Sequence, residues 1–153
     1  MIAVEVITKE HDLRQLVDEI NLASWDDANE MSEYDAEALL DYLDHEGTVF
    51  IACHDVVEGV RSLMGIASSR LEVKPYAKEC WLYVDEVDVC ANRRRKGAGQ
   101  AIMKKLIEVA EEAECVEVWL GAEVNNEAAN ELYRSIDPDE VVQVLGYTYE
   151  TQD

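Results

Sequence analysis

One stretch of the sequence, residues 87–100, limits the fold of this chain more than any other. It reads VDVCANRRRKGAGQ, which is an alternating apolar run followed by four consecutive basic residues, 93–96, and then by Gly-Ala-Gly. Apolar residues recur at helical spacing over about 98–113. The chain therefore passes from a strand, through a basic turn that contains glycine, into a helix.

This strand-turn-helix segment is also a candidate anion site. The first amides of a helix lack partners inside the helix and carry a partial positive charge, and glycine lets a ligand approach them closely. A phosphate bound there would also meet Arg94, Arg95 and Lys96. The segment has no P-loop sequence, and Ile102 takes the place of the third glycine of a dinucleotide fingerprint. The alternative is a basic turn that only caps the helix.

The basic turn stands out because the chain is otherwise strongly acidic. It has 13 Lys and Arg against 34 Asp and Glu, and its formal net charge of -21 is spread along the whole length. Such a charge repels the phosphate backbone, so we expect no nucleic-acid partner. The composition is typical of a salt-adapted, halophile-like protein. An ordinary acidic protein with cationic partners is the alternative.

The composition also indicates a folded chain. Its 153 residues, 48% of them apolar, suit a single domain over 1–153 with a sizeable core. No run of about 18 apolar residues is present, so we expect no membrane partner. The first ten residues lack a secretory signal, which favours a cytoplasmic location. The four cysteines form no C-x-x-C pair, and we expect buried free thiols and no metal site.

Periodicity and turn residues predict an α/β fold, a mixed sheet with helices on its faces, in the order β-α-α-β-β-β-α-β-α-β. The expected elements are a strand at 2–8, a helix at 12–22, a helix that opens with the capping-box pattern Ser32-x-x-Asp35 and ends near Gly47, strands at 48–53, 61–73 and 79–90, a helix at 98–113, a strand at 116–120, a helix at 126–136 and a last strand at 141–149.

Two motifs in this order resemble those of a known family. The pattern R-x-x-G-x-G over 94–99 resembles the acyl-CoA-binding motif of the GCN5-related N-acetyltransferase (GNAT) superfamily. A second family pattern, N-x-x-A-x-x-L-Y, occupies 126–133 on the next helix. The element order is similar to the family fold across nearly the whole chain. The resemblance implies an N-acetyltransferase that uses acetyl-CoA, and a non-catalytic acyl-CoA-binding module is the alternative.

The resemblance implies a role in cofactor binding for several positions. The backbone of strand 79–90 would bind the pantetheine arm as an added strand, and the glycine turn would surround the pyrophosphate. Asn126 would contact the arm near the thioester. The implied cofactor-binding residues are Val87, Asp88, Val89, Arg94, Arg95, Lys96, Gly97, Ala98, Gly99, Gln100 and Asn126.

The implied chemistry is direct attack of an amine on the thioester, which needs a base and an acid. The family gives the acid role to a tyrosine at the position of Tyr133, which donates a proton to the departing thiolate. For the base we favour Asp85, because simple alternation places it on one face with Val87 and Val89; Glu86 is second. A bulge would swap that parity. From the residues alone, Tyr133 could equally be a core aromatic and both acids solvated surface groups.

The acceptor is left open by the sequence. The resemblance implies a primary amine on a small molecule, a peptide or a protein. In the family the region 21–34 shapes the acceptor pocket, but here it is acidic and carries no recognisable signature. Homodimers are frequent in the family, although no feature of the sequence requires one.

Overall fold

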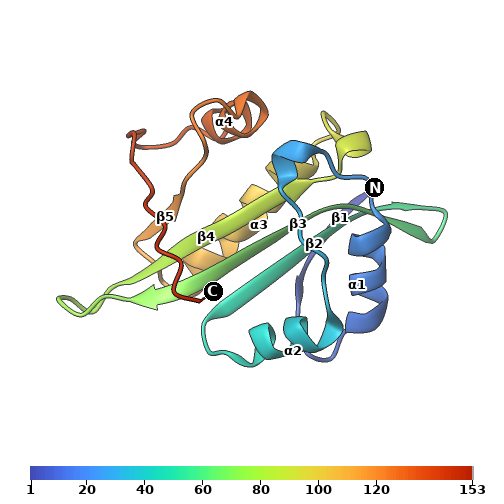
Figure 1. Cartoon of the computed structure of the whole chain (residues 1–153), viewed down its shortest axis with the longest axis horizontal. Helices are drawn as coiled ribbons and strands as arrows, with labels where there is room; N and C mark the ends of the chain where they lie inside the picture. Colours follow the sequence, from blue (N-terminus) through green and yellow to red (C-terminus); the bar gives the residue numbers. More distant parts are fainter. Residues whose placement is uncertain (153) are drawn as a thin grey trace. The chain divides into compact units, whose positions relative to one another are not determined.

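The computed structural model of the chain describes residues 1–152 and contains a five-stranded mixed sheet (Figure 1). The strand order is β1-β2-β3-β4-β5, with antiparallel neighbours except for the parallel pair β4 and β5. The elements are β1 (Ile2–Ile7), α1 (Leu13–Leu22), η1 (Asp27–Asn29), α2 (Ala36–Asp44), β2 (Thr48–Val57), β3 (Val60–Val73), β4 (Cys80–Val89), η2 (Ala91–Arg93), α3 (Ala98–Glu112), β5 (Glu117–Leu120) and α4 (Glu127–Arg134).

The chain forms two compact units. The first, residues 1–121, contains the whole sheet with α1, α2 and α3. The second begins at Ala122 and contains α4 and the C-terminal segment. The single domain over residues 1–153 stays a prediction, and its last residue lies outside the described part of the chain.

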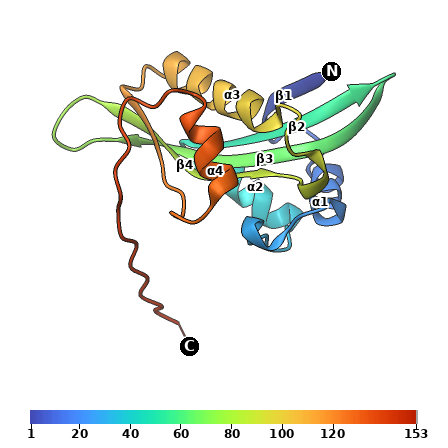
Figure 2. The ribbon, with the colours of Figure 1, turned by 90° about the horizontal axis from the view of Figure 1, so that it is seen from above.

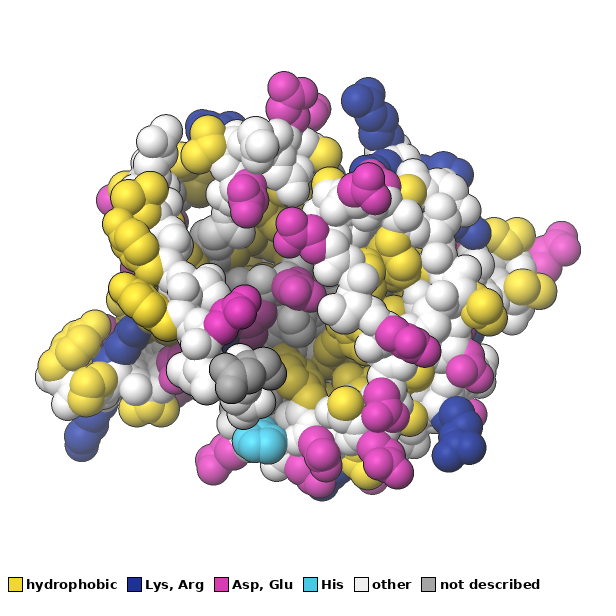
Figure 3. All heavy atoms as spheres, viewed as in Figure 1, with side chains coloured by type: hydrophobic (Ala, Val, Ile, Leu, Met, Phe, Trp, Pro, Cys, Tyr) yellow, Lys and Arg dark blue, Asp and Glu magenta, His cyan; other side chains and the backbone are white. Residues whose placement is uncertain are grey.

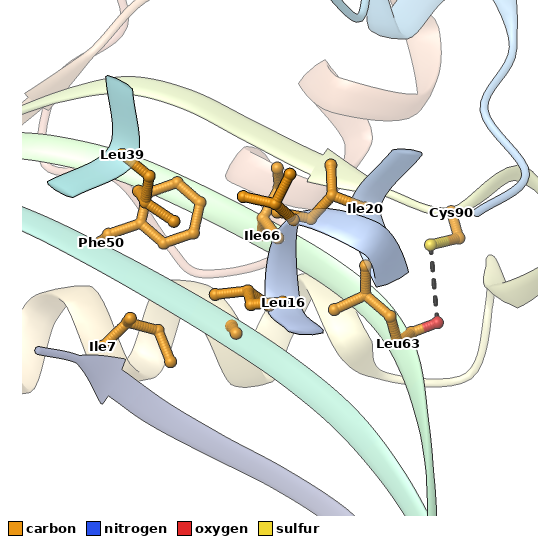
Figure 4. Close-up of a cluster of buried hydrophobic side chains, with 10 residues drawn as sticks. Ile7, Leu16, Ile20, Leu39, Phe50, Leu63, Ile66 and Cys90 are labelled. Carbon is orange, nitrogen blue, oxygen red and sulfur yellow. Dashed lines mark hydrogen bonds between the residues drawn. The ribbon is translucent and has the colours of Figure 1, made fainter. Parts of the chain in front are cut away.

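Helices cover both faces of the sheet in the first unit. Figure 2 shows α3 on one face and α1 with α2 on the other. On the α1/α2 face, Leu16 and Ile20 of α1 and Leu39 of α2 pack with Phe50 and Ile66 of the sheet (Figure 4). Burial of these apolar side chains is the main force that holds the two helices on the sheet.

A close approach holds α3 on the opposite face. A Cβ atom added at Gly65 would lie 2.7 Å from the carbonyl oxygen of Asp88 and 3.0 Å from Cδ1 of Ile102. Glycine is therefore required at this point of β3, where the end of β4 and the first turns of α3 come together. This packing fixes the start of α3 next to the end of β4.

The predicted elements up to α4 are confirmed, with small shifts at their ends, and so is the α/β fold class. The start of α2 was placed wrongly. Its N-cap is Asp35, whose side chain accepts a hydrogen bond from the Glu37 amide, and Ser32 is not the cap. The reason is that both backbone groups of Tyr34 bond to the side chain of Asn21, which keeps this residue outside the helix.

The predicted last strand at 141–149 is wrong for the described structure, in which this segment is neither strand nor helix. Its large apolar residues are all exposed, namely Val141, Val142, Val144, Leu145, Tyr147 and Tyr149. β-branched and aromatic residues show only a tendency to form strands, because a strand also needs a neighbour for its backbone N–H and C=O groups. No strand of the described chain pairs with this segment.

The four cysteines are free, as predicted, but only Cys53 and Cys90 are buried. The sulfur atoms of Cys80 and Cys115 lie 3.2 Å apart at the start of β4 and just before β5. Among residues 1–152, no group of three or more His, Cys, Asp or Glu is arranged to hold a metal ion. Within the same residues, no helix has the length and apolar character needed to cross a membrane.

Candidate functional site

The sheet forks at the carboxyl end of β4. The parallel pairing of β4 with β5 runs from Trp81 to Val84 and ends there, while β4 continues alongside β3 to Val89. The Cys90 amide donates a hydrogen bond to the Met64 carbonyl of β3 at 2.8 Å. By alternation, the backbone groups of Val87 and Val89 then point to the open edge, and those of Asp88 point to β3. A ligand with an extended, amide-containing arm can pair with this edge as an added strand.

The open edge leads directly to the positive end of α3. Gly97 is the helix N-cap, with a left-handed φ of 90°, and no side chain caps the helix at this end. Inside the helix, the first backbone hydrogen bond runs from the Ala101 amide to the Gly97 carbonyl. The amides of Ala98 and Gly99 therefore lack partners within the helix and can bind an anion. A Cβ atom at Gly97 would meet only Ile2, at 3.6 Å.

The four basic residues before Gly97 divide into two pairs. Arg93 donates to Ser62 at 2.7 Å and forms an ion pair with Asp55 at 3.5 Å, and Arg94 also bonds to neighbours within the protein. Arg95 and Lys96 are exposed. The exposed pair is therefore available to a phosphate, and Arg93 is tied to the sheet.

The expected shared face of Asp85 with Val87 and Val89 is wrong, because β4 contains a bulge. In the register with β3, Val84 lies opposite Ser69 and Glu86 lies opposite Ser68, so Asp85 is an extra residue. Its carboxylate forms an ion pair with Arg70. Asp85 thus has a basic partner, Arg70, which also pairs with Glu72.

The bulge places Glu86 and Asp88 on the α1/α2 face of the sheet. They pair with Ser68 and Ile66 of β3, and Ile66 belongs to the core under α1 and α2. The Glu86 side chain is exposed, but partial burial raises its pKa, and the negative charges of Asp88, Asp85 and Glu30 raise it further. Glu86 forms no ion pair within the described residues. Asp85 is exposed but ion-paired and Asp88 is buried, so Glu86 is the β4 acid that is both exposed and outside an ion pair among the described residues.

Asp88, unlike Glu86, is buried, with 6% of its surface exposed. Its Oδ1 accepts a hydrogen bond from Asn29 at 3.0 Å, whereas its Oδ2 is buried without a partner among the described residues. Burial raises the pKa of Asp88, although Asn29 and Arg94 act in the opposite direction. Tyr34 lies close enough to both acids to interact with their charges. Burial, together with the charges of Glu86 and Asp88, raises the pKa of Tyr34 to about 12.

The raised pKa of Asp88 predicts a stability change with pH. An acid whose pKa is higher in the folded than in the unfolded protein binds protons more readily when folded. It therefore destabilises the fold as the pH rises from the unfolded-state pKa through the folded-state pKa. We expect Asp88→Asn to have a higher Tm than the wild type near neutral pH, with the difference disappearing below about pH 4. Thermal unfolding of both proteins across this range, at constant high salt, measures it. A wild type that melts higher at neutral pH contradicts the prediction.

The predicted residues of the second unit both lie on α4. Asn126 is the N-cap, and its Oδ1 accepts a hydrogen bond from the Ala129 amide at 3.1 Å. Tyr133 is half-buried and lies about two turns further along the same side of the helix. The asparagine of this motif therefore has a local role in starting the helix, and its side-chain amide nitrogen is not used by that bond.

Sequence reasoning missed the residues that face the β4 carboxylates. Asp26 and Asn29 form a capping box around η1, a pattern visible as Asp-x-x-Asn in the sequence. It also missed an aromatic row, in which the rings of Trp81 and Tyr83 stack with centroids 5.9 Å apart and Trp119 lies 6.1 Å from Tyr83. Tyr83 pairs with Arg70, two residues beyond Ser68, so these rings lie on the same face as Glu86.

Comparisons with known proteins identify a family and a fold. The model of the Acetyltransferase (GNAT) family matches residues 11–136. No curated protein matches the sequence. An aminoglycoside acetyltransferase from an uncultured soil metagenomic sample, solved in complex with sisomicin, is 21% identical and has a TM-score of 0.82; the match covers 99% of this chain and 97% of that one.

Two further solved structures share the fold. The ribosomal-protein-alanine N-acetyltransferase of Brucella melitensis biovar Abortus 2308 is 20% identical with a TM-score of 0.71, over 97% of this chain and 100% of that one. AAC(6')-Iy, in complex with the bisubstrate analog CoA-S-monomethyl-acetylneamine, is 13% identical with a TM-score of 0.71, over 99% of both chains. At these identities the similarity shows the fold alone.

Proposed function

Because this chain belongs to the GNAT acetyltransferase family, we propose that it transfers an acetyl group from acetyl-CoA to a primary amine. The observation that carries the proposal is the continuity of the open edge of β4 with the uncapped start of α3. The open edge of β4 suits the amide-containing arm of the cofactor, and the start of α3 suits its pyrophosphate. The edge and the helix start follow one another in the same order as the arm and the pyrophosphate in CoA.

The cofactor contacts follow from this arrangement. The backbone groups of Val87 and Val89 bind the pantetheine arm, as an added strand would. The amides of Ala98 and Gly99, with Gly97 and Gly99 allowing close approach, bind the pyrophosphate. Arg95 and Lys96 neutralise its charge. The resemblance to the family motif, and not the arrangement of the two units, assigns Asn126 a contact with the arm near the thioester.

The reaction needs one base and one acid. Glu86, directly or through a water molecule, takes a proton from the ammonium group of the acceptor. The neutral amine nitrogen then attacks the carbonyl carbon, the C–N bond forms, and the C–S bond breaks with its electron pair leaving on sulfur. Tyr133, by its resemblance to the tyrosine of the family motif, donates its phenolic proton to that thiolate. The nitrogen gives up its second proton to solvent as the amide forms, and the phenolate of Tyr133 regains a proton from solvent. The products are an N-acetylated amine and free CoA.

The proposal is tested by release of free thiol from acetyl-CoA at high salt, in the presence of small amines, aminoglycosides and peptides. Release that depends on one class of acceptor supports the proposal and identifies the acceptor class. The alternative is a non-catalytic module that binds acyl-CoA as a sensor. It predicts binding of acetyl-CoA with no thiol release for any acceptor.

Tyr133→Phe separates the role of the hydroxyl from that of the ring. The aromatic ring is kept, so we expect the protein to fold, while turnover falls by about tenfold or more because the departing thiolate loses its proton donor. Initial rates at saturating acetyl-CoA measure the effect, and circular dichroism checks the fold. Unchanged turnover would show that water or another residue protonates the thiolate.

We also propose that the protein is adapted to high salt. Figure 3 shows acidic side chains scattered over the face that carries α1 and α2, with basic side chains mainly toward its edges. CoA is itself a polyanion, so at low salt the net charge of -21 repels it, whereas at molar salt the screening length is only about 3 Å. We expect the affinity for CoA to fall sharply as salt is lowered in a sample that stays folded. Equal affinity at low and high salt contradicts this adaptation.

A further inference from the structure

Arg94 connects three parts of the first unit. Its guanidinium forms an ion pair with Asp26 and donates a hydrogen bond to the Asn29 side chain at 3.2 Å. Asn29 in turn donates to Asp88 of β4 at 3.0 Å. A backbone hydrogen bond of 2.7 Å, from Ala91 to the Ser24 carbonyl, joins the same two segments. The turn before α3 is thus bonded to the loop between α1 and α2.

The loop held in this way is tightly organised around η1. The Asp26 side chain accepts from the Ala28 amide, and the Asn29 side chain accepts from the Asp26 amide, both at 3.0 Å. Glu30 follows with a left-handed φ of 49°. Since every polar atom of the Asn29 side chain has a partner, the orientation of its amide is fixed. The loop then continues to Tyr34, beside Glu86 and Asp88.

The guanidinium of Arg94 is already bonded to the side chains of Asp26 and Asn29. Its hydrogen bond and charge hold the pKa of Asp26 below the usual range of that carboxyl. Turning Arg94 toward a phosphate would leave the carboxylate of Asp26 unpaired in a strongly acidic chain. Arg95 and Lys96, which are exposed beside Gly97, can bind the phosphate at no such cost.

We propose that Arg94 is a positioning residue for the amine acceptor and not a ligand of the cofactor phosphate. This inference rests on the proposed acetyl transfer, because it assigns the loop at 23–35 to the acceptor side of the reaction. Arg94 holds that loop, through Asp26 and Asn29, against the carboxylates of β4. The acceptor amine is therefore presented to Glu86 in a fixed position, and specificity for the acceptor depends on a residue in the middle of the basic turn.

The test compares Arg94→Gln with the matched variant Arg95→Gln, which removes the same charge one residue later. For Arg94→Gln we expect the KM of the acceptor to rise by roughly tenfold with the Kd of CoA changed by less than about threefold. For Arg95→Gln we expect the reverse: the Kd of CoA should rise by roughly tenfold, and the KM of the acceptor should change by less than about threefold. Arg94→Lys keeps the charge and should recover part of the loss. If Arg94→Gln weakens CoA binding as much as Arg95→Gln does, the proposal is overturned.

Two further measurements keep the inference separate from the proposed function. Asp26→Asn keeps a good capping residue but removes the ion pair, so it should reproduce the effect of Arg94→Gln, and the double variant should be no worse than either single one. Hydrogen exchange needs no turnover: we expect faster exchange of the amides in 23–35 in Arg94→Gln and unchanged exchange in Arg95→Gln. A wild type that binds CoA without turnover refutes the proposed function. Unchanged exchange in Arg94→Gln refutes the role of Arg94.

Discussion

The Gly97→Asp variant is expected to bind acetyl-CoA about a hundredfold or more weakly while it remains folded. Gly97 is the N-cap of α3 with a left-handed φ of 90°, so an aspartate there would not have the extended backbone in which a side chain caps a helix. The new carboxylate would lie next to the amides that bind the pyrophosphate, and its charge would repel the phosphates. No side-chain cap is present at this end in the wild type, so none is lost, and the helix should survive.

Gly59→Asp is the matched control for this variant. Gly59 has a φ of 79°, close to the 90° of Gly97, and no atom lies within 4 Å of an added Cβ atom. The two variants thus share the added charge and the backbone strain, but Gly59 lies in the exposed turn between β2 and β3. Titration calorimetry with CoA should find near wild-type affinity for Gly59→Asp. A similar loss in both variants would mean that charge or strain, and not the start of α3, determines affinity.

The second large effect is expected for Glu86→Gln, with a loss in turnover of about a hundredfold. The substitution keeps the shape of the side chain but removes the base. The wild type should also lose activity as pH falls, because Glu86 accepts a proton only as a carboxylate. Since burial and the neighbouring acids raise the pKa of Glu86, this loss should begin above the usual range for glutamate. Initial rates as a function of pH measure both effects.

Asp85→Asn is the control for the base. Its carboxylate pairs with Arg70 and occupies the extra position of the bulge, so its removal should leave most of the turnover intact. The loss of activity at low pH should move slightly to lower pH, because Asp85 is one of the charges that raise the pKa of Glu86. The opposite result, a large loss for Asp85→Asn and none for Glu86→Gln, would identify Asp85 as the base, as simple alternation along the strand predicts.

The sequence is most informative where the determinants are local. The strand-turn-helix at 87–100 could be predicted, because the apolar alternation, Gly97 and the helical spacing all lie within a few residues of one another. The face of the sheet on which Asp85 lies could not be predicted, because the bulge depends on how β4 pairs with β3. A pattern of period two carries no sign of an extra residue.

Long-range contacts explain the other differences. Nothing in the basic turn distinguishes Arg94 from Arg95, yet the first bonds to Asp26, a residue 68 positions earlier, and the second is exposed. Likewise, Asn21 bonds to the backbone of Tyr34 and delays the start of α2 until after Asp35. In each case a side chain that is distant in sequence decides the outcome.

The most direct test of acetyl transfer is to follow an isotope-labelled acetyl group from acetyl-CoA in a single turnover at high salt, with the acceptor that releases thiol. We predict that the label appears in the amide of the acceptor, in step with free CoA, and that none remains on the protein, because the amine attacks the thioester directly. Label that stays in protein-bound acetyl-CoA with every acceptor would contradict acetyl transfer and identify the chain as an acyl-CoA-binding module.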